Sequence, residues 1–444
     1  MIGGPLNRRA ALAAVIVGES LPDYGGSGAN QMALALILAA NGHRVAFASR
    51  WPVDRAGERV RSLEAAGVAL LVPKFAGATG AFAPSEYALR RSFRLASAVV
   101  RNRAVGGVRD DAMVVEQRER DVHAILRRRV SRWLRRQRPA PPVIHVIGRE
   151  TSPVMAPLRA LGVPMLFTEF GQLLNFGLDA ATVIPVRADG YSADSREGAR
   201  VLERLEGREV RFITSLGGFP EPPTPTPELA ANFVMTSRLD PVKQVHLAVE
   251  AVAQVPGIRL DIHGDGSARP RVEAAISDLE VSDRVTVHGM SDRNAVKAAL
   301  DRAHGFLMTS MPSEGTPTAM LEAMSRARAI VTTAVGGIPD IVADGAQALF
   351  HDSSPSDLAA KLTRLATEPG LAQRLGETAR RRWETEFTPE VIAGAYEDLY
   401  RDAVRSRATP PSTPGEPTRW RSGDLVPWNT ARARISHDWT DGRG

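Results

Sequence analysis

The segment Glu314–Glu322 has the residue types of an anion-binding site at the start of a helix. Thr316 is a favoured N-cap residue, and Pro317 suits the first helical position. The next two residues, Thr318 and Ala319, should therefore present backbone N–H groups without a partner inside the helix. Such groups lie at the positive end of the helix dipole, where a phosphate binds well.

A carboxylate stands at each end of this segment, and the second one falls inside the predicted helix. Glu322 is flanked by Leu321 and Ala323, and an ionised carboxylate is costly in apolar surroundings unless polar groups satisfy it. A pair of sugar hydroxyl groups would do so. The alternative is an N-capped surface helix that turns Glu322 to water.

Two cations, Arg238 and Lys243, follow a strand-like run at residues 232–236. A turn and the first turn of a helix can direct a guanidinium and an ammonium group at one point, as a diphosphate requires. Lys243 is one of only four lysines in a chain that otherwise uses arginine. The alternative is a solvated start of a helix.

These motifs together resemble those of family 4 of the glycosyltransferases, which are retaining enzymes of the GT-B fold. The matching stretches of the C-terminal half occur in the expected order between residues 232 and 400. Besides those above they are His263-Gly264-Asp265-Gly266, residues 335–342, and the positions of Arg380, Trp383 and Phe387. The N-terminal half has fewer matches, which are Gly25-Gly26, Gly42-His43, His145 and residues 188–195.

The resemblance implies an enzyme of hexosyltransferase type that moves a sugar from a nucleoside-diphosphate sugar to an unknown acceptor. Arg238 and Lys243 would stabilise the leaving diphosphate as electrostatic catalysts. Glu314 would bind the transferred sugar and Glu322 the ribose diol. The full set of residues implied to bind the donor is Gly25, Gly26, Arg238, Lys243, Gly264, Met290, Glu314, Gly315, Thr316, Thr318, Ala319 and Glu322. The base would lie near Gly264 and Met290, although a methionine after a strand more often packs in a core.

The chain departs from the family at two places on the acceptor side. The family's His-x-His reads His145-Val146-Ile147, and its Thr-x-His-Gly reads Thr168-Glu169-Phe170-Gly171. His145 and Glu169 are therefore the acceptor-side candidates, with a satisfied buried histidine and a water-facing loop carboxylate as their alternatives. Two other functional classes stay open: a catalytically silent nucleotide-sugar binder or assembly partner, and a GT-B isomerase or phosphorylase.

The sequence lacks both cysteine and the Asp-x-Asp triplet of metal-dependent glycosyltransferases. It contains no cysteine, which excludes disulfides, thiolate metal sites and a thiol nucleophile. It also contains no Asp-x-Asp triplet, the usual ligand pair for a catalytic divalent ion in such enzymes. We therefore expect a metal-independent reaction with no cofactor beyond the nucleotide-sugar substrate.

Strand-like runs alternate with helical patterns along the 444 residues, which favours parallel sheets covered by helices on both faces. We predict an α/β protein of the GT-B class, with two doubly wound Rossmann-like domains facing each other across a cleft. The expected parts are an acceptor-side domain (1–216), a proline-rich hinge (217–229), a nucleotide-sugar-binding domain (230–386), a helix crossing back (387–405) and a tail containing Pro, Arg and Trp (406–444). The expected strands are 11–17, 44–49, 68–71, 143–147, 164–168, 210–214, 233–236, 259–263, 285–288, 305–308, 329–333 and 348–350, and helices are expected near 30–41 and 55–66.

Positive charge is concentrated in a helical segment at residues 85–138, which includes a helix with an apolar stripe and many arginines. Such a helix could lie on an anionic membrane surface. The alternative is a helix whose stripe packs on the sheet and whose arginines are solvated. No nucleic-acid-binding motif accompanies the charge.

No apolar run is long enough to span a membrane, and the short run after Arg8-Arg9 reads as a strand rather than as a signal peptide. We expect a cytoplasmic protein, at most peripheral at the inner face of the membrane. The three tryptophans of the tail suggest that it drapes over the globular body, or that it forms an interface with a second copy or a partner protein.

Overall fold

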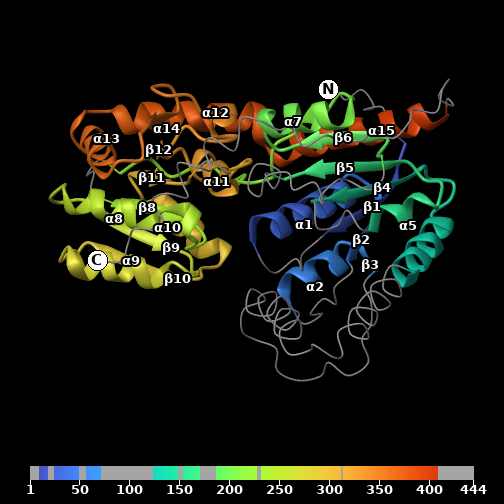
Figure 1. Ribbon diagram of the computed structural model, residues 1–444, viewed down its shortest axis with the longest axis horizontal. Helices are drawn as coiled ribbons and strands as arrows, with labels where there is room; N and C mark the ends of the chain where they lie inside the picture. Colours follow the sequence, from blue (N-terminus) through green and yellow to red (C-terminus); the bar gives the residue numbers. More distant parts are fainter. Residues whose placement is uncertain are drawn as a thin grey trace, which may run out of the picture.

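The computed structural model describes residues 10–18, 25–49, 57–71, 124–148, 154–170, 187–227, 232–311 and 314–408. These residues form two α/β domains that lie side by side, each built on one parallel sheet (Figure 1). The predicted fold class is therefore confirmed.

The sheet of the first domain has the strand order β3-β2-β1-β4-β5-β6-β7. Its central strand β1 pairs in parallel with β2 on one side and with β4 on the other. The strands are β1 (Ala13–Gly18), β2 (Arg44–Ser49), β3 (Ala69–Leu71), β4 (Pro142–Ile147), β5 (Met165–Glu169), β6 (Gly190–Ala193) and β7 (Arg211–Phe212).

The sheet of the second domain has the order β10-β9-β8-β11-β12-β13 and is also parallel. Its strands are β8 (Asn232–Thr236), β9 (Arg259–His263), β10 (Val285–Gly289), β11 (Gly305–Leu307), β12 (Ala329–Thr332) and β13 (Ala348–Phe350). In both sheets the central strands are continuous apolar runs buried on both faces, since helices cover each side.

The helices pack their apolar sides onto these sheets and create one hydrophobic core on each sheet face. Those of the first domain are α1 (Gly25–Ala40), α2 (Glu58–Ala65), α5 (Met155–Arg159) and α7 (Arg196–Glu206). The second domain has η3 (Pro241–Lys243), α8 (Val245–Ala253), α9 (Arg269–Asp278), α10 (Arg293–Arg302), α11 (Thr318–Ser325), α12 (Ile338–Ile341), α13 (Pro355–Thr367), α14 (Leu371–Arg382) and the π-helical turn η4 (Trp383–Phe387). The last helix is α15 (Pro389–Ala408).

All twelve expected strands are present, and their bounds agree with the expected ones or differ by one or two residues. The sequence analysis missed β6, because its residues Gly-Tyr-Ser-Ala do not form an apolar run. It also placed the start of α1 too late, since the helix includes Gly25 and continues to Ala40. Residues 406–408 belong to α15 rather than to the tail, and the tail from 409 onward lies outside the described residues.

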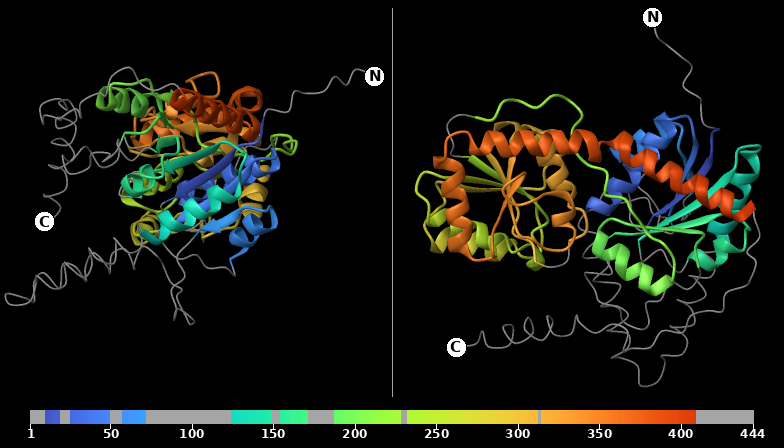
Figure 2. Two further views of the ribbon diagram at one scale, coloured as in Figure 1. Left: turned by 90° about the vertical axis from the view of Figure 1, so that its right-hand side faces the viewer. Right: turned by 90° about the horizontal axis from the view of Figure 1, so that it is seen from above.

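Helix α15 follows the second domain in sequence but packs on the sheet of the first (Figure 2). Its residues Ile392, Tyr396 and Tyr400 are buried in the same core as Ile16 of β1. The Glu397 carboxylate accepts a hydrogen bond from the Asn41 side chain at 2.8 Å, just after α1. The C-terminal helices therefore tie the two domains together.

Residues 124–136, the described end of the basic segment, are helical. Leu126, Val130 and Leu134 are buried in the core of the first domain, and Trp133 packs against them. The apolar stripe of this helix thus packs on the sheet, which was the alternative to a helix lying on a membrane. Arg127, Arg128, Arg132, Arg135 and Arg136 are exposed.

The side chains of two arginines that follow α11, including their guanidinium groups, are buried. Arg326 and Arg328 are 1 % and 0 % exposed. The Arg326 Nε donates to the Asp301 carboxylate at 2.6 Å, and the Arg328 Nη1 donates to the Ala303 carbonyl at 3.0 Å. Burial lowers the pKa of Arg328 to about 10, so its guanidinium remains charged at neutral pH.

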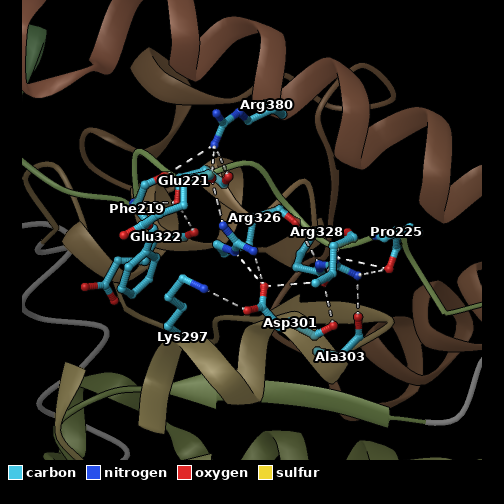
Figure 3. A network of polar contacts seen from close by, with 12 residues as sticks. Phe219, Glu221, Pro225, Lys297, Asp301, Ala303, Glu322, Arg326, Arg328 and Arg380 are labelled. Carbon is cyan, nitrogen blue, oxygen red and sulfur yellow. Dashed lines mark hydrogen bonds and ion pairs between the residues drawn. The ribbon is translucent and has the colours of Figure 1, made fainter. Parts of the chain in front are cut away.

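These arginines also hold the connector between the domains, which the sequence analysis treated as a hinge. The described connector, residues 217–227, contains five prolines and no helix or strand. Arg326 donates to the Glu221 carbonyl at 2.9 Å, and Arg328 donates to the Thr224 carbonyl. Figure 3 shows both guanidinium groups directed at the connector. Its carbonyls therefore join the network of the second domain.

We expect Arg328→Ala to lower the free energy of unfolding by about 3 kcal/mol or more, because the connector carbonyl and the Ala303 carbonyl lose a charged donor and a void remains. Arg364→Ala, which removes an exposed arginine of α13, serves as the matched control and should change it by less than about 0.5 kcal/mol. Urea unfolding at pH 7 measures both. Equal losses in the two variants would contradict the anchoring role of Arg328.

Candidate functional site

The candidate site lies where the strand order of the second sheet reverses. From β8 the chain continues toward β9 on one side, and from β11 it continues toward β12 on the other. The carboxyl ends of parallel strands at such a point diverge and leave room for a ligand. The segment after β8 carries Arg238 and Lys243, and the segment after β11 carries Glu314.

Lys243 and Glu314 are brought together as an ion pair in which the Lys243 Nζ donates to the Glu314 carboxylate. Their side chains are only 18 % and 11 % exposed. The backbone fixes both partners: the Thr309 hydroxyl donates to the Lys243 carbonyl at 2.7 Å, and the Gly337 amide donates to the Glu314 carbonyl at 2.9 Å. The fold therefore directs opposite charges from two loops to one point.

Arg238, predicted to act with Lys243, is outside this pair. Its guanidinium is half exposed and forms an ion pair with Asp240, two residues further on. The structure thus places Arg238 at the open side of the same loop and Lys243 on its inner side.

Gly264 and Gly266 allow the loop after β9 to pack against the loop that carries Arg238. A Cβ atom on Gly264 would lie 1.7 Å from the Ser237 carbonyl oxygen, and one on Gly266 would lie 2.5 Å from that of Leu239. Gly264 also has a φ of +146°, which side chains disfavour. The Gly-Asp-Gly motif therefore sets the shape of the loop pair.

Helix α11 starts later than the sequence predicted. Thr318 is its first residue and Pro317 occupies the N-cap position, so Thr316 does not cap the helix. The Thr316 hydroxyl instead donates to the backbone carbonyl of Asp194 in the first domain. Thr318 and Ala319 still lie in the first turn, where amide groups have no acceptor within the helix.

Asp194 is a residue of this site that sequence reasoning did not single out. It follows β6, and its carboxylate accepts a hydrogen bond from the Thr316 amide at 3.2 Å. A Cβ atom on Gly315 would lie 2.2 Å from the same carboxylate. The first domain therefore contacts the Glu314-Gly315-Thr316 loop directly. The only signal in the sequence was the weak match at residues 188–195.

Glu322 lies on α11 with most of its side chain covered. Burial raises the pKa of Glu322 to about 7, and the guanidinium of Arg293 opposes this shift. The Arg293 Nη1 lies 3.5 Å from the Glu322 Oε1. The expectation of a costly carboxylate within an apolar helix is met, and its partner is an arginine that the sequence analysis did not identify.

His145 lies inside the first domain, in β4. It is fully buried, and its two ring nitrogens lie 2.8 Å from the Tyr400 hydroxyl and 2.5 Å from the Thr168 hydroxyl. Burial lowers the pKa of His145 to about 3, so its ring is neutral. The structure therefore agrees with the alternative, a buried histidine whose two ring nitrogens both have hydrogen-bond partners.

The remaining candidates have varied surroundings. Glu169 ends β5 and is 1 % exposed, so the water-facing alternative is wrong for it. Met290 follows β10 and is 73 % exposed, which contradicts the alternative that it packs in a core. Gly25 and Gly26 are the first residues of α1.

One cavity of the described residues lies away from the candidate site. A cavity of about 610 Å³ opens among α7, β7 and α15, with Arg196, Arg211 and Asp398 in its wall and none of the predicted donor residues. Within the described ranges no cluster of three or more His, Asp or Glu side chains is placed to hold a metal ion. No helix of those ranges is both long and apolar enough to cross a membrane.

Residues 223–382 match the family model described as glycosyl transferases group 1. Among curated relatives, the putative colanic acid biosynthesis glycosyltransferase WcaL of Escherichia coli is 29 % identical over 193 residues, which cover 41 % of this chain and 48 % of WcaL. The D-inositol 3-phosphate glycosyltransferase of Mycobacterium marinum is 27 % identical over 317 residues, covering 65 % of this chain and 66 % of the relative. The first relatives are matched over 23 to 58 % of their own length.

Solved structures match over most of the chain. Anabaena Alr3699/HepE, in complex with UDP and glucose, has a TM-score of 0.64 and 15 % identity, covering 88 % of this chain and 99 % of that one. Sucrose-phosphate synthase of Thermosynechococcus elongatus has a TM-score of 0.66 and 19 % identity, with coverage of 88 % and 99 %. These similarities show that the chain has the GT-B fold.

Proposed function

We propose that this protein is a glycosyltransferase that takes its sugar from a nucleoside-diphosphate sugar. The observation that carries the proposal is the Lys243–Glu314 pair, which two loops place at the carboxyl end of the second sheet. The stretch that matches glycosyl transferases group 1 contains both residues. Structures of similar fold include Alr3699/HepE with UDP and with UDP-glucose.

In the proposed complex, the nucleoside-diphosphate sugar binds beside Lys243 and Glu314. Lys243 would turn from Glu314 to the diphosphate, joined by Arg238 and by the amides of Thr318 and Ala319. Glu314, released from Lys243, would accept hydrogen bonds from hydroxyl groups of the sugar. Breaking the bond between sugar and phosphate puts negative charge on the leaving diphosphate, which the cations stabilise.

The proposed reaction retains the configuration of the sugar and needs no metal ion. Retention is carried over from the resemblance to family 4. Metal independence is supported by the two cations, because Arg238 and Lys243 can supply the positive charge that a divalent ion provides at other diphosphate sites. The proposed enzyme class is that of hexosyl and related glycosyltransferases, EC 2.4.

The acceptor is a glycan, a lipid-linked sugar or a small molecule. We propose a cytoplasmic enzyme, and contact with the inner face of an anionic membrane would use the exposed arginines of residues 124–138, since the apolar stripe is covered. Self-association or a partner protein is proposed only through residues 409–444, which lie outside the described residues.

A catalytically silent nucleotide-sugar binder is the second candidate. Ile147 and Phe170 stand where the family has histidines, and His145 is buried, so the acceptor side lacks the residues that usually meet the reacting sugar. A GT-B isomerase or phosphorylase is not favoured, because residues 223–382 match glycosyl transferases group 1.

Transfer activity tests the proposal against the silent binder. Purified protein is incubated with radiolabelled UDP-, GDP- and ADP-sugars, with water, lipid-linked and small-molecule acceptors, in the presence and absence of excess EDTA. We expect turnover of at least one donor and no loss with EDTA. Binding without turnover would favour the silent binder, and activity lost with EDTA and restored by Mn²⁺ would refute the metal-free mechanism.

Lys243→Ala and Arg238→Ala should each weaken nucleoside-diphosphate binding by about 1.5–3 kcal/mol, the range for hydrogen bonds to charged groups. Lys361→Ala removes a cation of the same type from an ion pair with Asp357 on α13 and should leave affinity unchanged. Calorimetry with UDP, GDP and ADP measures the losses. Unaltered affinity in both site variants would rule out the diphosphate assignment.

We expect substitutions of Glu322 and Glu314 to affect nucleotide affinity and transfer rate differently. Glu322→Gln should weaken nucleotide binding, because the ribose is present in donor and product alike. Glu314→Gln should spare nucleotide affinity and lower kcat, because its partner is the sugar that leaves. Nucleotide calorimetry and transfer kinetics on both variants decide this. Identical losses in both assays would mean that the pair only supports the start of α11.

A further inference from the structure

Arg293 links the candidate site to the connector between the domains. It is the first residue of α10, which Asp292 caps through a hydrogen bond from the Ala295 amide at 2.8 Å. Its guanidinium donates to the Gly218 carbonyl of the connector and stacks over the Phe219 ring, with its Cζ 4.4 Å from the ring centroid. Arg293 is therefore held from three sides while more than half of its side chain stays exposed.

From this place Arg293 faces the carboxylate of Glu322, at 3.5 Å. Glu322 belongs to an α11 turn whose neighbours Leu321 and Ala323 are fully buried. Burial disfavours its charged form, and Arg293 is the charge that favours it. The two groups come from different helices, so their contact depends on the tertiary structure.

The other cations near Glu322 are engaged elsewhere (Figure 3). Lys297, one turn further along α10, forms an ion pair with Asp301 at 3.1 Å. Arg326, directly after the end of α11, pairs with the same Asp301 carboxylate at 2.5 Å. Arg380 of α14 donates to the carbonyls of Ser325 and Phe219. Arg293 is thus the cation that is aimed at Glu322 among the described residues around it.

We propose that Arg293 is a positioning residue for nucleotide recognition, which holds the Glu322 carboxylate ionised and ready to accept hydrogen bonds from the ribose diol. This inference rests on the proposed function, since it takes Glu322 as the ribose ligand. Arg293 acts through Glu322, and its contacts with Gly218 and Phe219 keep it in place before the nucleotide arrives.

The proposal predicts how affinity depends on pH. An ionised carboxylate can accept two hydrogen bonds from a diol, and a protonated one has to lose its proton first, so affinity falls as the pH drops below the pKa of Glu322. With that pKa at about 7 in the free protein, affinity at pH 6 should be about tenfold lower than at pH 8. Without the charge of Arg293 the midpoint should move to higher pH by on the order of one unit.

The test measures nucleotide-sugar affinity by calorimetry between pH 5.5 and 9. The probe is the tightest binder among UDP-glucose, GDP-mannose and ADP-glucose, because a diphosphate esterified at both ends lacks the proton that titrates near pH 6 in a phosphate monoester. The variants are Arg293→Gln, which removes the charge, and Arg293→Lys, which keeps it. Arg302→Ala, an exposed arginine at the other end of α10, is the matched control.

We expect the midpoint to rise in Arg293→Gln, to return close to its original value in Arg293→Lys, and to stay unchanged in Arg302→Ala. Glu322→Gln should give a flat profile. An equal loss of affinity at every pH in Arg293→Gln would overturn the proposal, since a merely structural arginine has that effect. A flat profile for the unaltered protein would overturn it too. A pH-dependent profile that persists in Glu322→Gln would instead refute the ribose assignment within the proposed function.

Discussion

A guanidinium group can be buried only where oxygen atoms accept its N–H donors, and this requirement organises the second domain. Arg326 and Arg328 meet it with the Asp301 carboxylate and with carbonyls of the connector. The connector is rich in proline and cannot join a sheet, so its carbonyls are available for these bonds. The arginines supply hydrogen-bond donors and the connector carbonyls supply acceptors, so the connector packs as part of the second domain.

The anchored connector has a consequence for the candidate site. Because Gly218 and Phe219 are fixed, Arg293 has a carbonyl and an aromatic ring to hold it beside Glu322. The second carboxylate, Glu314, is matched in the same way by Lys243. Both acidic groups of the site are therefore balanced by a cation from another element, which lowers the cost of burying them. Ligand hydroxyl groups and phosphates can replace these partners without leaving a charge unsatisfied.

Two polar residues of the first domain, Asp194 and His145, differ in their relation to the site. Asp194 touches the Thr316 amide directly, at the point where the two domains meet. His145 acts only within the fold, as its hydrogen bonds to Tyr400 and Thr168 join α15 to the sheet. His145 therefore hydrogen-bonds to the crossing helix α15 in this structure.

The sequence by itself determined the alternation of apolar strands and amphipathic helices, because strand and helix periodicity are local properties of the chain. It also predicted the segment Glu314–Glu322, Arg238 and Lys243, since their spacing along one or two turns restricts where their side chains can point. It missed β6, whose small and polar residues carry no apolar run. It also misplaced the N-cap of α11, because the Thr316 hydroxyl found an acceptor in the other domain.

Only the tertiary structure decided which charged side chains form ion pairs in the site. Lys243 and Glu314 are 71 positions apart, and their contact follows from the neighbouring positions of β8 and β11 in the sheet. The contact of Arg293 with Glu322 follows in the same way from the packing of α10 beside α11 and the connector. Electrostatic and hydrogen-bonding partners are chosen by distance in space, and no local pattern of residues encodes that distance.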